Sequence, residues 1–250
     1  MVLLPNSLLK RTTELEFAGE VVDADASTGF APGDKVAGFV APDTHITKRR
    51  GALAQYIAVK PAEIAKRPDS LTPNEASGVI GVALTAYQAL FEVAKLRQEP
   101  DQFVFINGGS TSVGMYAIQI AKSYGIRVAA STSAKNAKLV EELGAEVRAS
   151  CLCRGLVPDA SISHQVVDYT VAPLHQTLAE RYGSDKFDAF IEAVGMEDTL
   201  LYTRCESYLK PGGTYVACGP KPTGFFSALG FIWDFALRPR WLGGTKRRFT

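Results

Sequence analysis

The sequence has few of the residues that build metal sites and disulfide frameworks. Its 250 residues include four cysteines and three histidines, and neither set has the spacing of a zinc site. We therefore expect free thiols in a reducing compartment, which favours the cytoplasm, with the mitochondrion as the alternative. The formal net charge is only +1, so the chain lacks the broad positive field of a nucleic-acid-binding protein.

Long apolar runs are also scarce. The longest lies around residues 225–237, contains Asp234, and is too short to cross a bilayer. Membrane contact is therefore not expected. An amphipathic contact between residues 225–241 and a membrane surface is the weakest of the alternatives left open. The apolar fraction of 46% is ordinary for a globular protein with a hydrophobic core.

What the sequence does have is a strand, a glycine-rich turn and a helix in succession. The run Phe103–Ile106 predicts a strand buried on both faces. Apolar residues at helical spacing predict a helix over Met115–Tyr124, ended by Gly125. The turn between them, Asn107–Gly114, carries no bulky side chain before Val113. This order is that of the phosphate-binding unit of dinucleotide-binding folds.

The turn departs from the G-x-G-x-x-G pattern, since it reads Gly109-x-Thr111-x-x-Gly114. We expect Gly109 to allow the tight turn and Gly114 to let the helix pack close to the strand. Thr111 replaces the middle glycine, and we expect it to offer a backbone N–H and a hydroxyl to a pyrophosphate. The alternative is a plain strand-to-helix connection without a ligand.

The next strand, expected over Ile126–Ser131, predicts which cofactor is bound. An NAD site places an acidic residue at the end of this strand to bind the ribose diol, and this sequence has none there. Hydroxyl, amide and cationic side chains follow instead, and they suit a 2′-phosphate: Ser131, Ser133, Lys135, Asn136 and Lys138. The sequence therefore favours NADP(H). The alternative for the two lysines is an exposed helix face.

Elsewhere the chain predicts a β-rich start followed by alternating strands and helices. The early strands are expected over residues 15–22, 35–40 and 51–59, with a turn at Pro32–Asp34. A capping box at Thr72 and Glu75, with Pro73 after the cap, starts a helical region that extends to Leu96 and breaks around Gly78 and Gly81. Later helices are expected over residues 136–143, 174–182 and 200–209, and later strands over 166–169, 187–191 and 214–218, the last after a turn at 211–213.

This alternation predicts an α/β fold with a doubly wound parallel sheet. Ligands of such sheets bind at the carboxyl ends of the strands. Four segments follow strand ends and are expected at that edge: Gly108–Gly114, Ser131–Lys135, Ala193–Gly195 and Gly219.

Taken together, seven motifs resemble the medium-chain dehydrogenase/reductase superfamily. They are Phe-Ala-Gly-Glu-Val-Val at 17–22, Pro-Gly-Asp-Lys-Val at 32–36, Gly-Ala-Leu-Ala-Gln-Tyr at 51–56, Leu-Thr-Ala-Tyr-Gln-Ala-Leu at 84–90, Asn-Gly-Gly-Ser-Thr-Ser-Val-Gly at 107–114, Leu-Gly-Ala at 143–145 and Leu-Lys-Pro-Gly-Gly at 209–213. The nearest resemblance is to the zinc-independent quinone oxidoreductase and enoyl reductase branch, in a fungal-like form. It covers nearly the whole chain outside residues 147–165.

The resemblance implies a Rossmann domain that binds NADP(H) over residues 98–250. It implies a β-rich GroES-like catalytic domain, here incomplete, over residues 1–97. It implies hydride transfer to a small quinone or α,β-unsaturated carbonyl, and it places Thr85 near the nicotinamide end and Tyr169 near the adenosine end. Zinc-dependent members carry a His where this chain has Leu15 and a Cys where it has Gly81, so no metal is expected. No catalytic residue can be named, and a homodimer is left open. A non-catalytic NADPH-binding protein or a truncated pseudo-enzyme is the alternative.

The predicted cofactor-binding residues combine both arguments. They are Thr85, Gly108, Gly109, Ser110, Thr111, Ser112, Val113, Gly114, Ser131, Ser133, Lys135, Asn136, Tyr169, Ala193, Val194, Gly195 and Gly219.

The resemblance also implies truncation at both ends and an insert at Val147–Gln165. Without these nineteen residues, Leu-Gly-Ala-Glu would run directly into Val-Val-Asp-Tyr. A Val codon begins with GT and a Gln codon can be CAG, which are the borders of an intron. Our hypothesis is a retained intron or gene-model error. The alternative is a functional loop in which Cys151, Cys153 and His164 form an incomplete metal clip.

Overall fold

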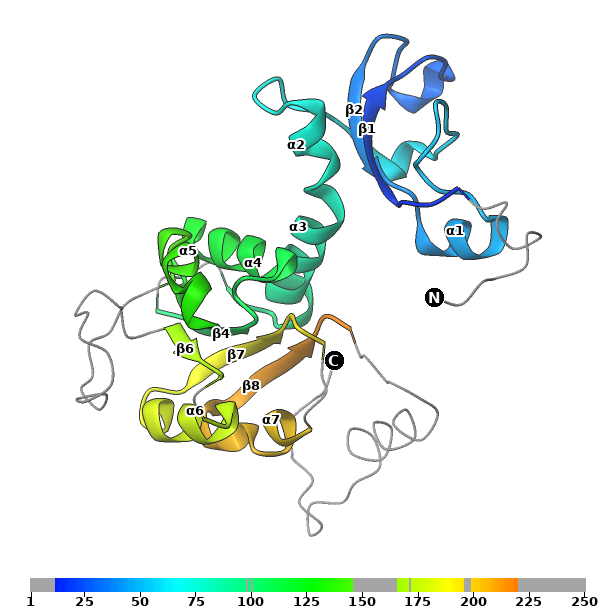
Figure 1. Cartoon of the computed structure of the whole chain (residues 1–250). Helices are drawn as coiled ribbons and strands as arrows, with labels where there is room; N and C mark the ends of the chain where they lie inside the picture. Colours follow the sequence, from blue (N-terminus) through cyan, green and yellow to red (C-terminus); the bar gives the residue numbers. More distant parts are fainter. Residues whose placement is uncertain are drawn as a thin grey trace. The chain divides into compact units, whose positions relative to one another are not determined.

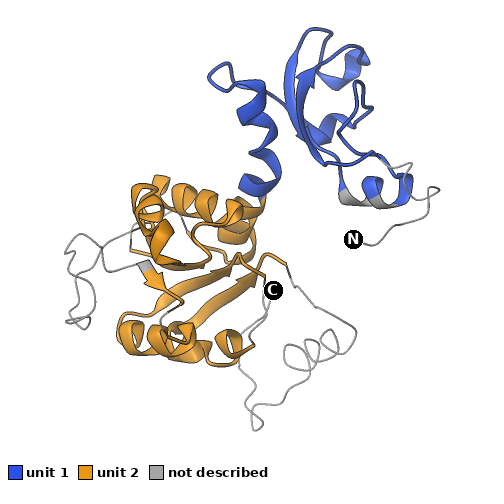
Figure 2. Ribbon diagram, viewed as in Figure 1, with its two compact units in different colours: residues 1–84 blue, residues 85–250 orange. Residues whose placement is uncertain are grey.

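The structure is a computed structural model that describes residues 12–97, 99, 101–145, 166–170, 172–195 and 199–219. It divides into two compact units, Met1–Leu84 and Thr85–Thr250 (Figure 2). The division lies inside the helix α3 (Ile80–Tyr87), which is therefore shared between the units. The division at residues 97 and 98 expected from the sequence stays a prediction. The insert at 147–165 and the segment 225–241 lie outside the described residues.

The first unit is built on a three-stranded antiparallel sheet in the order β1-β2-β3 (Figure 1). The strands are β1 (Glu16–Glu20), β2 (Lys35–Phe39) and β3 (Ile64–Lys66). The 3₁₀ turns η1 (Ala26–Thr28) and η2 (Pro61–Glu63) and the helix α1 (Pro42–Lys48) complete the connections. The turn before β2 has the predicted chemistry, because Gly33 has a φ of 91° and the Asp34 carboxylate accepts from the Ala31 N–H at 3.0 Å.

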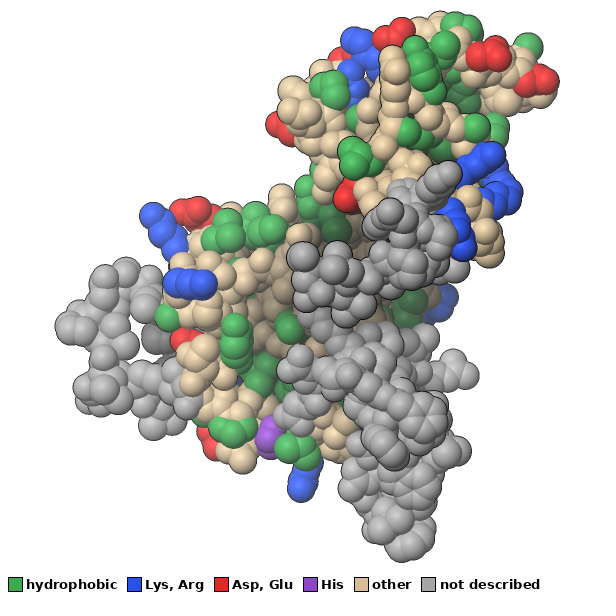
Figure 3. Space-filling model, turned by 45° about the vertical axis from the view of Figure 1, so that its right-hand side comes forward, with side chains coloured by type: hydrophobic (Ala, Val, Ile, Leu, Met, Phe, Trp, Pro, Cys, Tyr) green, Lys and Arg blue, Asp and Glu red, His purple; other side chains and the backbone are tan. Residues whose placement is uncertain are grey.

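The predicted strand at 51–59 is wrong, and α1 was not predicted. Among the described residues, only Ala52 and Leu53 of this segment donate backbone hydrogen bonds to the chain before β1, at 2.8 and 3.0 Å. The apolar alternation of this segment is not buried, since Leu53 and Tyr56 are 70% and 69% exposed. On the face seen in Figure 3, hydrophobic side chains of this unit lie among acidic and basic ones. An alternating pattern alone therefore misassigned this stretch, and the third strand is β3.

The capping box before α2 (Pro73–Ser77) is confirmed. The Thr72 hydroxyl accepts from the Glu75 N–H at 3.3 Å, and the Glu75 carboxylate accepts from the Thr72 N–H at 2.8 Å. The break at Gly78 is also confirmed, and α3 (Ile80–Tyr87) then continues into the π-helical turn η3 (Gln88–Val93). The break expected around Gly81 is wrong, because Gly81 lies inside α3.

The second unit is the predicted doubly wound fold, a five-stranded parallel sheet in the order β6-β5-β4-β7-β8. Its strands are β4 (Phe103–Asn107), β5 (Arg127–Thr132), β6 (Val166–Asp168), β7 (Phe187–Glu192) and β8 (Leu209–Ala217). One face is covered by α4 (Ser112–Ser123) and α5 (Ala137–Glu142), and the other by α6 (Leu174–Tyr182) and α7 (Leu200–Thr203) (Figure 1). The 3₁₀ turns η4 (Ala134–Asn136) and η5 (Cys205–Ser207) precede α5 and follow α7.

The central strand β4 serves both hydrophobic cores. Val104 and Ile106 belong to the core beneath α4 and α5, whereas Phe103 and Phe105 belong to the core beneath α6 and α7. All four side chains are 1% exposed or less. This is the burial expected of an uninterrupted apolar run in a parallel sheet.

The helix predicted over 200–209 is wrong in length, and the predicted turn at 211–213 lies within a strand rather than before it. The helix α7 ends at Thr203, and β8 already begins at Leu209. Phe187 pairs with Leu209 and Ala189 with Thr214, so the Pro-Gly-Gly segment lies within an irregularity of the strand. Gly212 takes a φ of 85° there, and this allows the strand to resume pairing.

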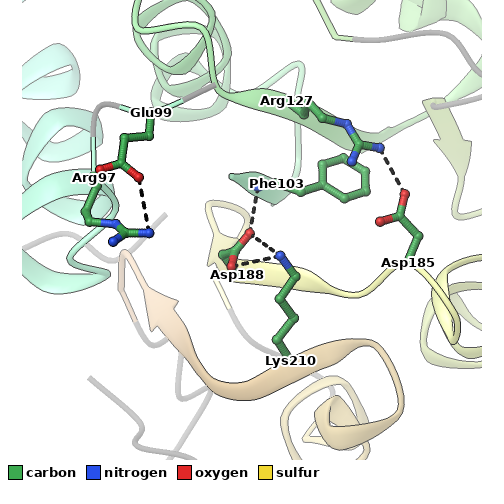
Figure 4. Close-up of polar contacts among 7 residues, drawn as sticks. All are labelled: Arg97, Glu99, Phe103, Arg127, Asp185, Asp188 and Lys210. Atoms are coloured by element: carbon green, nitrogen blue, oxygen red, sulfur yellow. Dashed lines mark hydrogen bonds and ion pairs between the residues drawn. The ribbon is translucent and has the colours of Figure 1, made fainter. Parts of the chain in front are cut away.

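Charged side chains fix the amino edge of the sheet (Figure 4). The Asp188 carboxylate accepts from the Phe103 N–H at 2.8 Å and from the Lys210 ammonium at 2.8 and 3.0 Å. Arg127 pairs with Asp185 at 2.9 Å and places its guanidinium carbon 4.2 Å from the centre of the Phe103 ring. These contacts join the starts of β4, β5, β7 and β8, and the opposite edge carries the predicted ligand residues.

Candidate cofactor site

The four predicted segments meet at the carboxyl edge of the sheet. The N–H of Gly108 donates to the Ser131 hydroxyl at 2.9 Å, and the N–H of Gly109 donates to the Ser131 carbonyl at 2.7 Å. The N–H of Ala193 donates to the Asn107 carbonyl at 3.0 Å. The N–H of Cys218, beside Gly219, donates to the Glu192 carbonyl at 2.9 Å. Backbone hydrogen bonds therefore connect the ends of β4, β5, β7 and β8.

The glycines of the turn divide their roles differently from the prediction. The positive φ of the tight turn, 84°, is at Gly108 and not at Gly109. A Cβ on Gly109 would lie 2.9 Å from the Ala130 Cβ, so this glycine permits close packing against β5. A Cβ on Gly114 would lie 2.1 Å from the Gly108 carbonyl oxygen. Gly114 therefore brings α4 close to the end of β4, as expected.

Thr111 does not offer its polar groups to a ligand as predicted. Its hydroxyl donates to the Gly108 carbonyl at 2.8 Å and accepts from the Gly114 N–H at 3.0 Å, and its own N–H donates to the Gly108 carbonyl at 2.9 Å. Thr111 is the N-cap of α4. Within the described part of the chain, the N–H groups of Ser112 and Val113 have no acceptor. The first turn of α4 therefore has two donors available for an anion.

The side chains after β5 also lie at this edge. The Thr132 hydroxyl donates to the Ser110 hydroxyl at 3.0 Å, which ties the glycine-rich turn to β5. Ser133 is the N-cap of η4 and its hydroxyl makes no capping hydrogen bond. Lys135 is exposed, and it has no ion-pair partner among the residues that the structure describes. By contrast, Lys138 lies 3.8 Å from Glu142 on α5.

Two predicted residues come from outside these four segments. Tyr169 directly follows β6, the outer strand beside β5, and is 52% exposed. Thr85 is half-buried in α3, next to Ala86 of the core beneath α4 and α5. Their proximity to nicotinamide or adenosine stays a prediction.

Two buried polar residues at this edge, Asn107 and Glu192, were not among the predicted site residues. They close β4 and β7 and are 7% and 1% exposed. The Asn107 amide nitrogen donates to Glu192 Oε2 at 2.6 Å, and the Val194 N–H donates to Glu192 Oε1 at 2.9 Å. The Ser131 hydroxyl donates to Asn107 Oδ1. A polar residue at the carboxyl end of a mostly apolar strand was the signal that could have identified both.

The buried carboxyl group affects the ionisation of its surroundings. Burial raises the pKa of Glu192, and hydrogen bonds from Asn107 and from the N–H groups of Val194 and Gly195 oppose that rise. Burial, together with the charge of Glu192, raises the pKa of the Cys218 thiol to about 11. Cys218 is therefore a protonated thiol at neutral pH rather than a nucleophile.

A cavity of about 790 Å³ lies in the first unit, between β1 and residues 52–59. None of the predicted cofactor-binding residues lines it. Among the described residues, no group of three or more His, Cys, Asp or Glu side chains could hold a metal ion. The described helices are all too short or too polar to cross a membrane.

Comparison with known proteins places this geometry in a family. No protein-family model matches the chain. The trans-enoyl reductase poxH of Penicillium oxalicum is 32% identical over 271 residues, which cover 94% of this chain and 63% of that protein. The quinone oxidoreductase of Coxiella burnetii superposes with a TM-score of 0.67 at 26% identity, over 98% of this chain and 64% of that one. The chain belongs to the medium-chain dehydrogenase/reductase superfamily.

Another relative is similar over a shorter stretch. The mitochondrial NAD(P)H oxidoreductase RTN4IP1 of Danio rerio is 30% identical over 185 residues, which cover 73% of this chain and 41% of that protein. The chain thus spans less than two thirds of the length of these relatives. The parallel sheet with its helices, together with the small antiparallel sheet, is the architecture that the chain shares with the Coxiella burnetii enzyme.

Proposed function

We propose that this protein is an NADP(H)-dependent oxidoreductase that transfers hydride to a small quinone or α,β-unsaturated carbonyl compound. The observation that carries the proposal is the carboxyl edge of the sheet. A capped helix there presents two unpaired N–H groups, and the neighbouring strand ends in hydroxyl and cationic side chains with no carboxylate. The names of the relatives, an enoyl reductase, a quinone oxidoreductase and an NAD(P)H oxidoreductase, support it.

The residues at this edge fit the parts of a dinucleotide. The N–H groups of Ser112 and Val113 would hold the pyrophosphate, helped by the positive end of the α4 dipole. Ser133, Lys135 and Asn136 would hold the 2′-phosphate, since a cation with hydroxyl and amide donors suits a doubly charged anion. The loop Ala193–Gly195 would lie against the nicotinamide end, with Thr85.

When bound, the nicotinamide ring supplies the hydride. The protein's contribution is to bind and orient the cofactor. The glycine-rich turn does this through backbone geometry, because Gly108 and Gly114 bring α4 close to the sheet. No described side chain at this edge is assigned as a proton donor.

Zinc independence is part of the proposal. Neither Leu15 nor Gly81 has a ligating side chain, and the Gly81 N–H donates to the Glu16 carboxylate. A Cβ on Gly81 would meet Glu16 Oε1 at 2.8 Å and the Phe39 ring at 2.9 Å, so the position is already filled. Glu16 therefore accepts a hydrogen bond from the first turn of α3. A homodimer and a cytoplasmic location stay predictions.

The test combines binding and turnover. NADPH and NADH are titrated against the chain by fluorescence, and NADPH oxidation is followed with a panel of quinones and enones. We expect NADPH to bind and at least one compound to be reduced. NADPH binding without any turnover would favour the alternative, a non-catalytic NADPH-binding protein. A chain that binds neither nucleotide would overturn the proposal.

A further inference from the structure

Glu192 is the most completely enclosed carboxyl group of the cofactor edge. Its side chain accepts from two donors on two segments, the Val194 N–H and the amide nitrogen of Asn107, and the backbone of Gly195 also favours its ionised form. No described group offers it an acceptor. Such a set of donors suits the ionised carboxylate, which accepts hydrogen bonds and donates none.

The contacts continue from Glu192 to the glycine-rich turn. Asn107 donates to Glu192 through its amide nitrogen and accepts from the Ser131 hydroxyl through its amide oxygen. The Ser131 hydroxyl in turn accepts from the Gly108 N–H at 2.9 Å. A single row of buried hydrogen bonds therefore runs from the Val194 loop on β7, through β4 and β5, to the turn that precedes α4.

We propose that Glu192 is a positioning residue that holds the glycine-rich turn and the Ala193–Gly195 loop in the relative geometry that the dinucleotide requires. This inference rests on the proposed function, because the dinucleotide is its ligand. Glu192 does not touch the Gly108 N–H, and it acts on the turn through Asn107 and Ser131. The three side chains of the row, Glu192, Asn107 and Ser131, are buried, so water cannot substitute for a partner that one of them loses.

Each hydrogen bond of the row has a defined donor and acceptor, and substitutions that exchange donor for acceptor test the proposal. In Glu192→Gln the new amide nitrogen faces the amide nitrogen of Asn107, donor against donor. Turning Asn107 relieves this conflict but leaves the Ser131 hydroxyl proton without its acceptor. In Asn107→Asp two carboxylates face each other. In the double variant Glu192→Gln/Asn107→Asp every donor again meets an acceptor, and the charge moves to the neighbouring strand.

The experiment compares the wild-type chain, the two single variants and the double variant at pH 8, above the ordinary glutamate pKa of 4.5. The control is Ile191→Val, which shortens a buried side chain of the same strand outside the row. NADPH affinity, melting temperature and amide exchange at Gly108 and Val194 are measured for each protein.

We expect Glu192→Gln to weaken NADPH binding and speed exchange at Gly108 by about tenfold each, since one buried polar group loses its partner. The double variant should return both values to within about threefold of the wild type. Ile191→Val should lower the melting temperature and leave both values unchanged. If Asn107→Asp does not fold, Glu192→Gln and the double variant still decide the question.

Two results would overturn the proposal: a double variant no better than Glu192→Gln, or a Glu192→Gln protein that binds NADPH and protects Gly108 as the wild type does. A wild type that does not bind NADPH would refute the proposed function instead. Amide exchange at Gly108 in the wild type, Glu192→Gln and the double variant would then decide whether Glu192 holds the turn.

Discussion

Lys135→Ala should separate the two nicotinamide cofactors. Lys135 follows β5 at the carboxyl edge, in η4, and it is exposed without an ion-pair partner among the residues described. If its ammonium group binds the 2′-phosphate, its removal weakens NADPH and leaves NADH, which lacks that phosphate, untouched. The variant changes no buried contact, so the melting temperature should stay the same.

The size of the effect follows from the exposure of the site. A hydrogen bond to a charged group contributes about 1.5–3 kcal/mol, and solvent around an exposed lysine favours the lower end of that range. A loss of about 1.5 kcal/mol corresponds to roughly a tenfold rise in the NADPH dissociation constant. Because the contact is exposed, the rise should shrink as the salt concentration increases.

The assay is fluorescence titration of both nucleotides at two salt concentrations. Lys138→Ala is the matched control, since this lysine is three residues further on, equally cationic, and placed beside Glu142 on α5. We expect it to change NADPH affinity by less than about threefold. Equal losses for Lys135→Ala and Lys138→Ala, or equal effects on NADPH and NADH, would refute the assignment of Lys135.

Four further predictions concern other parts of the chain. Gly114→Ala should destabilise the protein by about 1–3 kcal/mol or more in thermal unfolding, because its Cβ would meet the Gly108 carbonyl oxygen at 2.1 Å. Gly19→Ala, whose Cβ would have no atom within 4 Å, should not destabilise it, and similar losses of stability in the two variants would contradict this prediction. The pKa of Glu192 is raised in the folded protein, so the free energy of unfolding of the wild type relative to Glu192→Gln should be greatest below the ordinary pKa of 4.5 and should fall as pH rises through the raised pKa. Unfolding free energies that change with pH in the same way in both proteins would contradict this. Dialysis against a chelator should leave activity and melting temperature unchanged, and a stoichiometric zinc in elemental analysis would disprove zinc independence. Deletion of residues 147–165 should preserve NADPH affinity and should leave the melting temperature unchanged or raise it. Loss of NADPH binding would contradict the intron hypothesis.

The doubly wound sheet was predictable because its signals are local and strong. The uninterrupted apolar run of β4 and the glycines that follow it fixed the strand and the turn, and Thr72 with Glu75 fixed the start of α2. The strand predicted over 51–59 was wrong because an alternation of apolar and polar residues predicts a strand only where one face is buried, and burial depends on partners elsewhere in the chain. The helix predicted over 200–209 was too long because Leu209 pairs with Phe187, so β8 begins before the Pro-Gly-Gly segment.

The candidate site was predictable as a set of segments but not as a network. The rule that ligands bind at strand ends selected the carboxyl edge, where the structure brings the four predicted segments together. Spacing could not show that Thr111 uses its hydroxyl as a helix cap, since capping and ligand binding ask for the same residue types. Nor could it show that Asn107 and Glu192 meet, because they lie 85 positions apart and their contact exists only once β4 and β7 are paired.

That separation in sequence has a consequence for the order of folding. The contact between β4 and β5 closes a loop of 24 residues, whereas the contact between β4 and β7 closes one of 85. The longer closure costs about 1 kcal/mol more in chain entropy, so β4, α4 and β5 can assemble before β7 joins them. The glycine-rich turn would then form before the loop that faces it. The dinucleotide, which needs both, would bind only the finished sheet and would stabilise the native state rather than guide the chain towards it.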